Sequence, residues 1–176
     1  MPDFLAISGS LRAVSTNSAL VRALARDAPK GFGVTIYGDL GLLPIFNPDE
    51  EQRLPLAVAA LVEAVAHADG VIVSCPEYAH GVPGGLKNAL DWLVSHEAAV
   101  GKPAMLVHAS QRSHFARAAL AEIMRTMSFD LYDGPELEVP LLGKEPPEME
   151  AVLAEMEHRQ AIRSALTRFA DFVTAR

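Results

Sequence analysis

Short apolar runs alternate along this chain with longer segments of helical periodicity, and this alternation limits the possible folds more than any other feature. Four runs are candidate strands: Phe4–Ile7, Phe32–Tyr37, Gly70–Cys75 and Ala104–Ala109. The first, third and fourth are apolar throughout, as is typical of strands covered on both faces. The pattern predicts an α/β fold in which helices connect parallel strands.

Five segments carry apolar residues at the spacing of one helix face. They are Thr16–Ala28, Pro55–Ala68, Gly85–Ser95, Phe115–Met127 and Glu148–Thr174. A fifth strand is expected within Phe129–Val139, although Asp133-Gly134-Pro135 interrupts that segment. Two connecting loops are unusually long, Gly38–Leu54 and Pro140–Pro147, and long loops in a compact domain are often functional or interfacial.

These elements suit a doubly wound, three-layer α/β sandwich with helices on both faces of a five-stranded parallel sheet. With the common strand order 2-1-3-4-5, the order reverses between strands 1 and 3. Ligands of such folds bind at the carboxyl ends of those two strands. We therefore expect the loops that follow Ile7 and Cys75 to face one crevice.

Composition narrows the function classes. A chain of 176 residues, half of them hydrophobic, predicts one domain over residues 1–176. The net charge of −7 and the scattered distribution of 15 Lys and Arg residues argue against nucleic-acid binding. The single cysteine, Cys75, precludes an intramolecular disulfide and suits a reducing compartment. No apolar stretch reaches about 18 residues, so we expect a cytoplasmic protein outside the membrane.

The loop after the first strand reads S-G-S-L-R-A-V-S-T-N, from Ser8 to Asn17. It leads into a helix N-terminus, which presents unpaired N–H groups and favours an anion. Ser10, Ser15, Thr16 and Asn17 add short donors, and Arg12 adds a planar, permanently charged fork suited to phosphate. Helix capping by one of these residues is the simpler alternative, but it explains neither Arg12 nor Ser10.

The same loop narrows the kind of phosphate compound. It has only Gly9 where a dinucleotide fingerprint needs G-x-G-x-x-G, and the chain has no Walker A sequence and no G-x-S-x-G nucleophile elbow. A terminal phosphate monoester is the ligand that remains. No side chain is predicted to act as a catalytic residue.

The loop after the third strand reads C-P-E-Y-A-H-G-V-P-G-G-L-K-N-A-L-D-W, from Cys75 to Trp92. Its prolines and glycines allow the backbone to turn sharply and to approach a planar ring closely, with Tyr78 at the border of that ring. An ordinary proline-glycine turn before a helix explains the composition equally well.

Three stretches together resemble the NADPH-dependent FMN reductase family, which includes quinone, azo-dye and chromate reductases. Gly9-Ser10-Leu11-Arg12 with Ser15 and Asn17 matches its G-S-L-R-x-x-S-x-N signature. The segment from Pro76 to Trp92 matches P-E-Y-x-x-G-x-P-G-x-L-K-N-A-[IL]-D-W, and Leu43–Asp49 is similar to L-P-L-[YF]-N-P-D. The matches fall in order and cover most of the first hundred residues.

This resemblance implies a flavodoxin-like fold that binds FMN without covalent attachment and uses NADPH or NADH as hydride donor. Ser10, Arg12, Ser15 and Asn17 would then hold the phosphate, with backbone contacts from Leu11 and Thr16. The isoalloxazine ring would lie against Pro76, Glu77, Tyr78 and Ala79, and Ser110 would contribute from the loop after the fourth strand. The acceptor would be a small molecule such as a quinone or free flavin.

Two departures from the family pattern concern the flavin ring. Ala79 replaces the usual Asn, so only main-chain contact is expected at that position. After the fourth strand the family has G-A-S-x-G-x-x-G-G, whereas residues 108–116 read H-A-S-Q-R-S-H-F-A. Ser110 matches, but the glycines are gone, and a bulkier loop with Arg112 is expected to reshape the substrate side of the ring.

Other features bear on metals, assembly and alternatives. The six histidines show no metal-ligand spacing, and no metal site is predicted. The apolar residues Leu42, Leu43, Ile45 and Phe46 in a long loop indicate a subunit contact, and the family resemblance implies a homodimer or homotetramer. The alternatives to a reductase are a flavodoxin-like electron carrier, against which Arg12 argues, and a non-catalytic FMN- or anion-binding protein.

Overall fold

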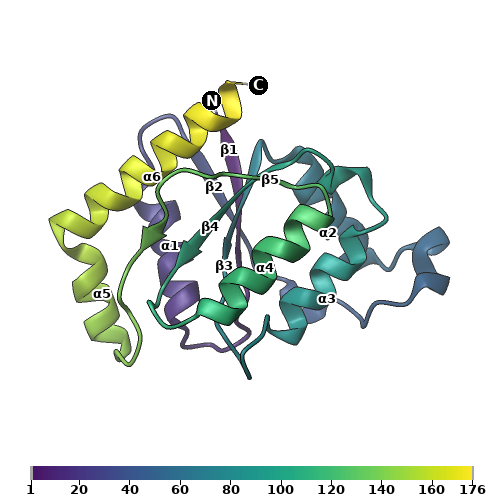
Figure 1. The fold of residues 1–176 in the computed structure, drawn as a ribbon, viewed down its shortest axis with the longest axis horizontal. Coiled ribbons are helices and arrows are strands. Elements are labelled where there is room, and N and C mark those ends of the chain that lie inside the picture. Colours follow the sequence, from purple (N-terminus) through teal and green to yellow (C-terminus); the bar gives the residue numbers. More distant parts are fainter. Residues whose placement is uncertain (1, 176) are drawn as a thin grey trace.

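The computed structural model describes residues 2–175, and a parallel sheet forms its centre (Figure 1). The strand order is β2-β1-β3-β4-β5, with β6 also paired to β4, and every pairing is parallel. This confirms the predicted order and with it the reversal between β1 and β3. The strands are β1 (Asp3–Ser8), β2 (Gly33–Tyr37), β3 (Gly70–Ser74), β4 (Pro103–His108), β5 (Asp130–Leu131) and β6 (Leu137–Glu138).

The edge beyond β4 differs from the prediction of one fifth strand. Two short strands pair with β4 there: β5 lies beside Pro103 and Ala104, and β6 lies beside Val107 and His108. The Asp133-Gly134-Pro135 turn separates them, because a proline has no N–H to donate to the ladder. The sheet therefore has six strands, of which the last two occupy the place of the expected fifth.

Helices cover both faces of the sheet, as predicted. Figure 1 shows α1, α5 and α6 on one face and α2, α3 and α4 on the other. The helices are α1 (Thr16–Asp27), α2 (Leu56–His67), α3 (Gly84–Leu93), α4 (His114–Thr126), α5 (Pro146–Ala154) and α6 (Met156–Thr174). Three short 3₁₀ helices, η1 (Leu40–Leu42), η2 (Pro48–Arg53) and η3 (Glu97–Ala99), lie in the connections.

The single helix expected over Glu148–Thr174 is wrong, because the chain bends between α5 and α6. Glu155 at the junction has ψ 139°, outside the helical range. The arginine next to the end of α1 stabilises the break: Arg26 Nη2 donates to the Leu153 carbonyl, 3.1 Å away, which is one of the unpaired carbonyls at the end of α5.

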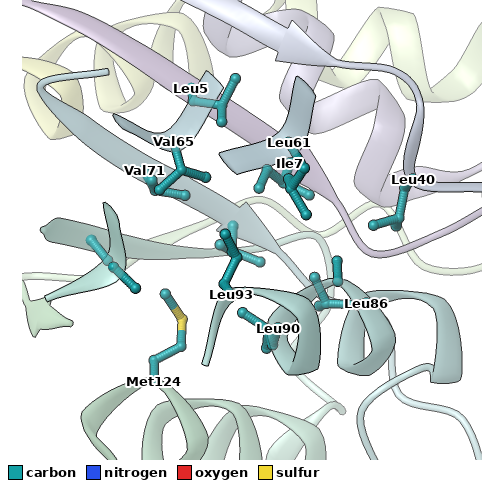
Figure 2. Packing of buried hydrophobic residues seen from close by; sticks show 14 of the residues in the cluster. Leu5, Ile7, Leu40, Leu61, Val65, Val71, Leu86, Leu90, Leu93 and Met124 are labelled. Atoms are coloured by element: carbon teal, nitrogen blue, oxygen red, sulfur yellow. The ribbon is translucent and has the colours of Figure 1, made fainter. Parts of the chain in front are cut away.

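Each face of the sheet has its own apolar layer, since successive side chains of a strand point to opposite sides. Leu5 and Val71 pack with Leu61, Leu93 and Met124 under α2, α3 and α4 (Figure 2). On the other face, the buried residues of β1, β3 and β4 pack against α1 and α6; they are Phe4, Ala6, Ile72, Met105 and Val107, with Leu20, Leu24, Leu166 and Phe169. All of β3 is buried, as its unbroken apolar sequence predicted.

None of the helices in residues 2–175 combines the length and the hydropathy that crossing a bilayer requires.

A buried carboxylate ties α1 to α5 and α6. Asp27 is 1% exposed and accepts hydrogen bonds from Arg26 Nη2 at 2.8 Å and from Arg159 Nε at 2.7 Å. Burial alone would raise the pKa of Asp27, but the hydrogen bonds from the two arginines outweigh it and lower that pKa below its ordinary value of 3.8. Asp27 therefore stabilises the fold as a carboxylate.

We predict that Asp27→Asn lowers the free energy of unfolding at pH 7 by about 1.5 to 3 kcal/mol, because charge-assisted hydrogen bonds are lost. Asp27 has a depressed pKa, so its contribution is present above pH 3.8 and is lost as the pH falls through the lower folded value. The difference between wild type and variant in urea unfolding should therefore shrink below about pH 4. Asp171→Asn, on the exposed side of α6, is the control and should change little; a pH-independent difference would contradict the role of the charge.

Candidate functional site

A cavity of about 440 Å³ opens at the carboxyl ends of β1, β3 and β4, where the sheet order predicted a crevice. The predicted residues that line it are Ser10, Arg12, Ser15, Thr16, Asn17, Pro76, Glu77, Tyr78 and Ser110. Leu11 and Ala79 are outside the lining: Leu11 lies beside Gly41 and Gly85, and Ala79 is at the exposed tip of a turn. The fold thus brings together residues that are up to a hundred positions apart in the sequence.

Ser15 begins α1 as its N-cap, which was the simpler interpretation of this part of the loop. Its Oγ accepts from the Ser18 N–H at 3.3 Å. A hydroxyl can accept and donate at once, so the Ser15 hydrogen is still available to a ligand. Thr16 follows in the first turn, where N–H groups without intrahelical partners face the cavity end of the helix. Capping and anion binding are therefore compatible in this loop.

Arg12 is the cation of the β1–α1 loop. Its backbone N–H donates to Ser10 Oγ at 3.3 Å, which fixes the loop between the two residues. Its guanidinium forms no ion pair within residues 2–175, although it lines the cavity. An exposed arginine without a carboxylate partner, next to a helix N-terminus, offers two donors to an anion.

The β1–α1 loop and the end of β3 are joined by two hydrogen bonds. The Gly9 N–H donates to the Ser74 carbonyl at 2.8 Å, and Ser74 Oγ donates to Asn17 Oδ1 at 2.9 Å. A Cβ at Gly9 would lie 2.9 Å from Leu86 Cδ2 and 3.2 Å from Pro76 Cδ, so only glycine allows this approach without rearrangement. Asn17 is 6% exposed, its carbonyl oxygen is occupied, and its amide nitrogen donates one hydrogen to Thr16 Oγ1 at 3.5 Å, so one amide N–H remains for a ligand.

The β3–α3 loop places a carboxylate and a phenol at the cavity. Glu77 Oε2 accepts from the Ala116 N–H at 2.9 Å, in the first turn of α4, and Tyr78 OH lies 3.4 Å from Ser10 Oγ. After Tyr78 the chain reverses in a tight turn closed by Tyr78–Gly81 backbone hydrogen bonds. Ala79 and His80 occupy the two central positions with φ of 50° and 58°, a left-handed conformation that favours Asn or Gly.

Cys75 lies beside the cavity but is not a reactive thiol. It is buried, and its Sγ donates to the Pro76 carbonyl at 3.2 Å. Burial, followed by the nearby Glu77 carboxylate, raises the pKa of the thiol to about 12. A nucleophilic cysteine needs a low pKa, so Cys75 behaves as a small apolar residue, as its position at the end of a buried strand predicted.

The β4–α4 loop, which lacks the glycines of the related sequences, is held by side chains. Arg112 donates its backbone N–H to Ser110 Oγ at 3.0 Å, and Arg117 donates to the Ser110 carbonyl and to Glu138. His108 is buried below this loop. Burial and the neighbouring Arg117 lower the pKa of His108 to about 4, so the ring is neutral at pH 7.

Sequence reasoning assigned too few residues to the far side of the cavity. The lining also includes Val14, Arg112, Ser113, Leu142, Gly143, Lys144, Glu145 and Met149. Half of the additional residues, Leu142 to Glu145, belong to the β6–α5 connection, whose only signal in the sequence was its unusual length. Among residues 2–175, no three His, Cys, Asp or Glu side chains lie together as metal ligands.

The cavity combines groups that suit an anion with an adjacent backbone segment. Hydroxyls, an arginine and a helix N-terminus gather on the β1–α1 side, and the Pro76–Tyr78 backbone forms the adjacent wall. His80, in the turn after Tyr78, stacks on Phe115 of α4, with the ring centres 4.5 Å apart.

Comparison with known proteins gives consistent results. The sequence model of the family described as NADPH-dependent FMN reductase matches residues 2–141. The quinone reductase of Escherichia coli is 39% identical over 102 residues, which are 56% of this chain and 54% of that protein. A match of this kind spans only about half the length of the first curated relatives.

Two further proteins match over longer segments. An NAD(P)H-dependent FMN reductase of Pseudomonas aeruginosa is 33% identical over 128 residues, 71% of this chain and 69% of that protein. The fold agrees with that of FerB, a flavoenzyme NAD(P)H:(acceptor) oxidoreductase from Paracoccus denitrificans, with a TM-score of 0.84 at 23% identity over 99% of this chain and 98% of that chain. The chain therefore belongs to the NADPH-dependent FMN reductase family and has its flavodoxin-like fold.

Proposed function

We propose that this protein is an NAD(P)H-dependent reductase that holds FMN non-covalently in the cavity and passes electrons to a small-molecule acceptor. One observation carries the proposal: the unpaired Arg12, with the hydroxyls of the β1–α1 loop, lies at the same cavity as the Pro76–Tyr78 wall. A cofactor that carries both a phosphate and a planar ring requires anion-binding groups next to a surface for the ring, and the β1–α1 loop and the Pro76–Tyr78 segment lie side by side in this way.

The residues present fit the phosphate of FMN. Among residues 2–175 no carboxylate forms an ion pair with Arg12. Ser15 retains a hydroxyl hydrogen while it caps α1, and Asn17 retains one of its two amide N–H groups, because the other donates to Thr16 Oγ1. A phosphate monoester carries a charge of about −1.5 to −2 at pH 7, which Arg12 and the positive end of α1 largely balance. We assign Ser10, Arg12, Ser15, Thr16 and Asn17 to the phosphate.

The wall of the cavity would hold the ring. Pro76 restricts the backbone through its ring, Tyr78 is held by backbone hydrogen bonds with Gly81, and Glu77 accepts from the Ala116 N–H, so this segment is supported before a ligand binds. Ser110, in the β4–α4 loop, lines the same cavity and is assigned to FMN as well. For Leu11 and Ala79, only backbone contacts are proposed, since neither side chain lines the cavity.

When bound, FMN would supply the redox chemistry, accepting hydride from NADPH or NADH and transferring electrons to a quinone or free flavin. The side chains of this protein bind and orient; none of them needs to move a proton for hydride transfer. A quinone as acceptor is supported by the names of two relatives, the quinone reductase of Escherichia coli and a 2-hydroxy-1,4-benzoquinone reductase of a Burkholderia species that is 42% identical over 86 residues.

The purified protein tests this function directly. We expect a flavin absorption spectrum after incubation with FMN and gel filtration, bleaching of that spectrum by NADPH, and steady-state NADPH oxidation when a quinone is added. Bound FMN without turnover would support an electron carrier instead. A colourless protein that does not quench FMN fluorescence would contradict both.

We further infer a homodimer or homotetramer, and a cytoplasmic location suited to an NAD(P)H-consuming enzyme with a free thiol. The β2–α2 connection projects from the body of the molecule (Figure 1), and no residue of its η2 helix is buried. Its base is fixed by Trp92 Nε1, which donates to the Pro44 carbonyl at 2.8 Å. Ile45 is nevertheless 87% exposed and Leu42 70% exposed, and such apolar surface is typical of a protein contact.

Arg12→Ala should weaken FMN binding by about 1.5 to 3 kcal/mol, because a charge-assisted contact with phosphate is lost. Fluorescence titration of FMN measures the change. Riboflavin, which has no phosphate, provides the matched ligand and should lose little. Arg125→Ala, on the exposed last turn of α4, is the control variant. Equal loss for FMN and riboflavin would place Arg12 away from the phosphate.

Ile45→Glu should shift the protein to a smaller assembly, because a charge would enter an apolar contact. Light scattering after gel filtration measures the mass. Folding of the subunit should be unaffected, since this side chain is 87% exposed, and the circular dichroism spectrum checks this. Glu50→Lys, on the exposed η2 helix, tests a change of charge without removal of an apolar side chain. A wild-type protein that is already monomeric would contradict the inferred oligomer.

A further inference from the structure

Three cations line the cavity, and one phosphate monoester does not need all of them. Arg12, Arg112 and Lys144 form no ion pair within the part of the chain that the structure describes. Arg12 belongs to the loop assigned to the FMN phosphate. Arg112 and Lys144 come from two other loops, after β4 and after β6, and nothing assigned so far uses them.

The carboxylates of the cavity do not cancel this excess. Glu77 accepts from Ala116 in the first turn of α4, and Glu145 is the N-cap of α5 in a capping box with Glu148. Each carboxylate thus lies at a helix N-terminus, whose dipole is equivalent to about half a positive charge. The positive charge of the three cations and of the N-termini of α1, α4 and α5, less the charge of the two carboxylates, is larger in magnitude than the charge of about −1.5 to −2 on one phosphate monoester.

Both additional cations are carried by loops whose backbones are fixed. Ser110 Oγ accepts the Arg112 N–H, and Arg117 holds the Ser110 carbonyl. The Lys144 N–H donates to the Leu141 carbonyl at 3.2 Å, and Leu141 is fully buried. Hydrogen bonds thus hold the backbone of both loops at the cavity, while the charged ends of the two side chains form no ion pair among the described residues. Rigid support of an unpaired charge favours ligand binding, because little ordering is required on binding.

The chain as a whole has a net charge of −7, so the excess of cations at this cavity contrasts with the charge of the rest of the molecule and favours an anionic ligand there. In the proposed reaction the pyridine dinucleotide is the other participant that carries phosphate. We propose that Arg112 and Lys144 form a second phosphate subsite, which binds a phosphate of NADPH or NADH when FMN occupies the first. This inference rests on the proposed function and adds specific residues to it.

Two phosphate groups of the donor could occupy the subsite: the 2′-phosphate, which only NADPH carries, or the pyrophosphate, which both donors share. The chemistry is the same, and a comparison of the two dinucleotides distinguishes them. The subsite also accounts for the loop after β4, where Arg112 stands in place of the glycine-rich sequence of related proteins.

The test uses the FMN-loaded protein and isothermal titration with NADP⁺ and NAD⁺, which bind without turnover. We expect Arg112→Ala and Lys144→Ala each to weaken binding by about tenfold or more, an effect that diminishes at high salt. Arg112→Lys should retain part of the affinity, since it keeps the charge but loses the planar fork. Arg125→Ala is the matched control and should leave affinity within twofold. Loss for NADP⁺ alone identifies the 2′-phosphate; equal loss identifies the pyrophosphate.

The FMN affinity of each variant, measured by fluorescence, separates the two phosphate sites. It should change by less than about threefold, because neither side chain is assigned to a contact with the FMN phosphate and only a screened charge effect remains. A large loss of FMN affinity would assign Arg112 and Lys144 to the first phosphate and overturn the second subsite. Unchanged affinity for both dinucleotides, or no dinucleotide binding by the FMN-loaded wild type, would overturn it as well. A wild-type protein that takes up no FMN overturns the proposed function itself, and this is seen before any variant is made.

Discussion

The contact between the β1–α1 loop and the end of β3 is the constraint on which the rest of the site depends. Gly9 approaches Ser74 to 2.8 Å, and a Cβ at this position would require Leu86 and Pro76 to shift. The Ser74 hydroxyl then fixes Asn17 at the start of α1. The loop proposed to hold the anion and the Pro76–Tyr78 segment, some sixty positions apart, are thereby brought to one cavity. The reversal of strand order makes room for this contact, and the glycine makes it possible.

Charged side chains are arranged in opposite ways at the cavity and in the interior of this molecule. The acidic chain repels anions in general, whereas the cavity collects cations from three loops. In the interior the opposite arrangement occurs: Asp27 is the buried charge, and arginines approach it from the surface. The cations at the cavity form no ion pair within residues 2–175, so a bound anion would be their partner. The Asp27 carboxylate, in contrast, is paired with arginines at a buried position that a ligand cannot reach. The paired cluster stabilises the fold, and the unpaired cluster is the one proposed to bind ligands.

Much of the fold was predictable from the sequence: the apolar runs of β1, β3 and β4 indicated their burial, and the order followed from the common topology of doubly wound sheets. The break at Glu155 was not, since the apolar stripe continues across it and only the position of Arg26, at the end of α1, reveals a partner for the exposed carbonyl. The residues of the β1–α1 loop were identified by their chemistry. Lys144 was missed because its side chain has an ordinary sequence context, and its place at the cavity results from the packing of Leu141.

The division of the fifth strand has a consequence for how this protein can evolve. β6 carries Glu138, which binds Arg117, and Arg117 in turn holds the carbonyl of Ser110 at the cavity. With glycines in the β4–α4 loop, the conformation of the loop would depend on its own residues. In this chain the conformation depends instead on β6, an edge strand outside the site. Substitutions at the edge of the sheet could therefore alter the acceptor side gradually, while Gly9 and the loops that it joins stay unchanged. Divergence of substrate range would then begin at the periphery of the fold.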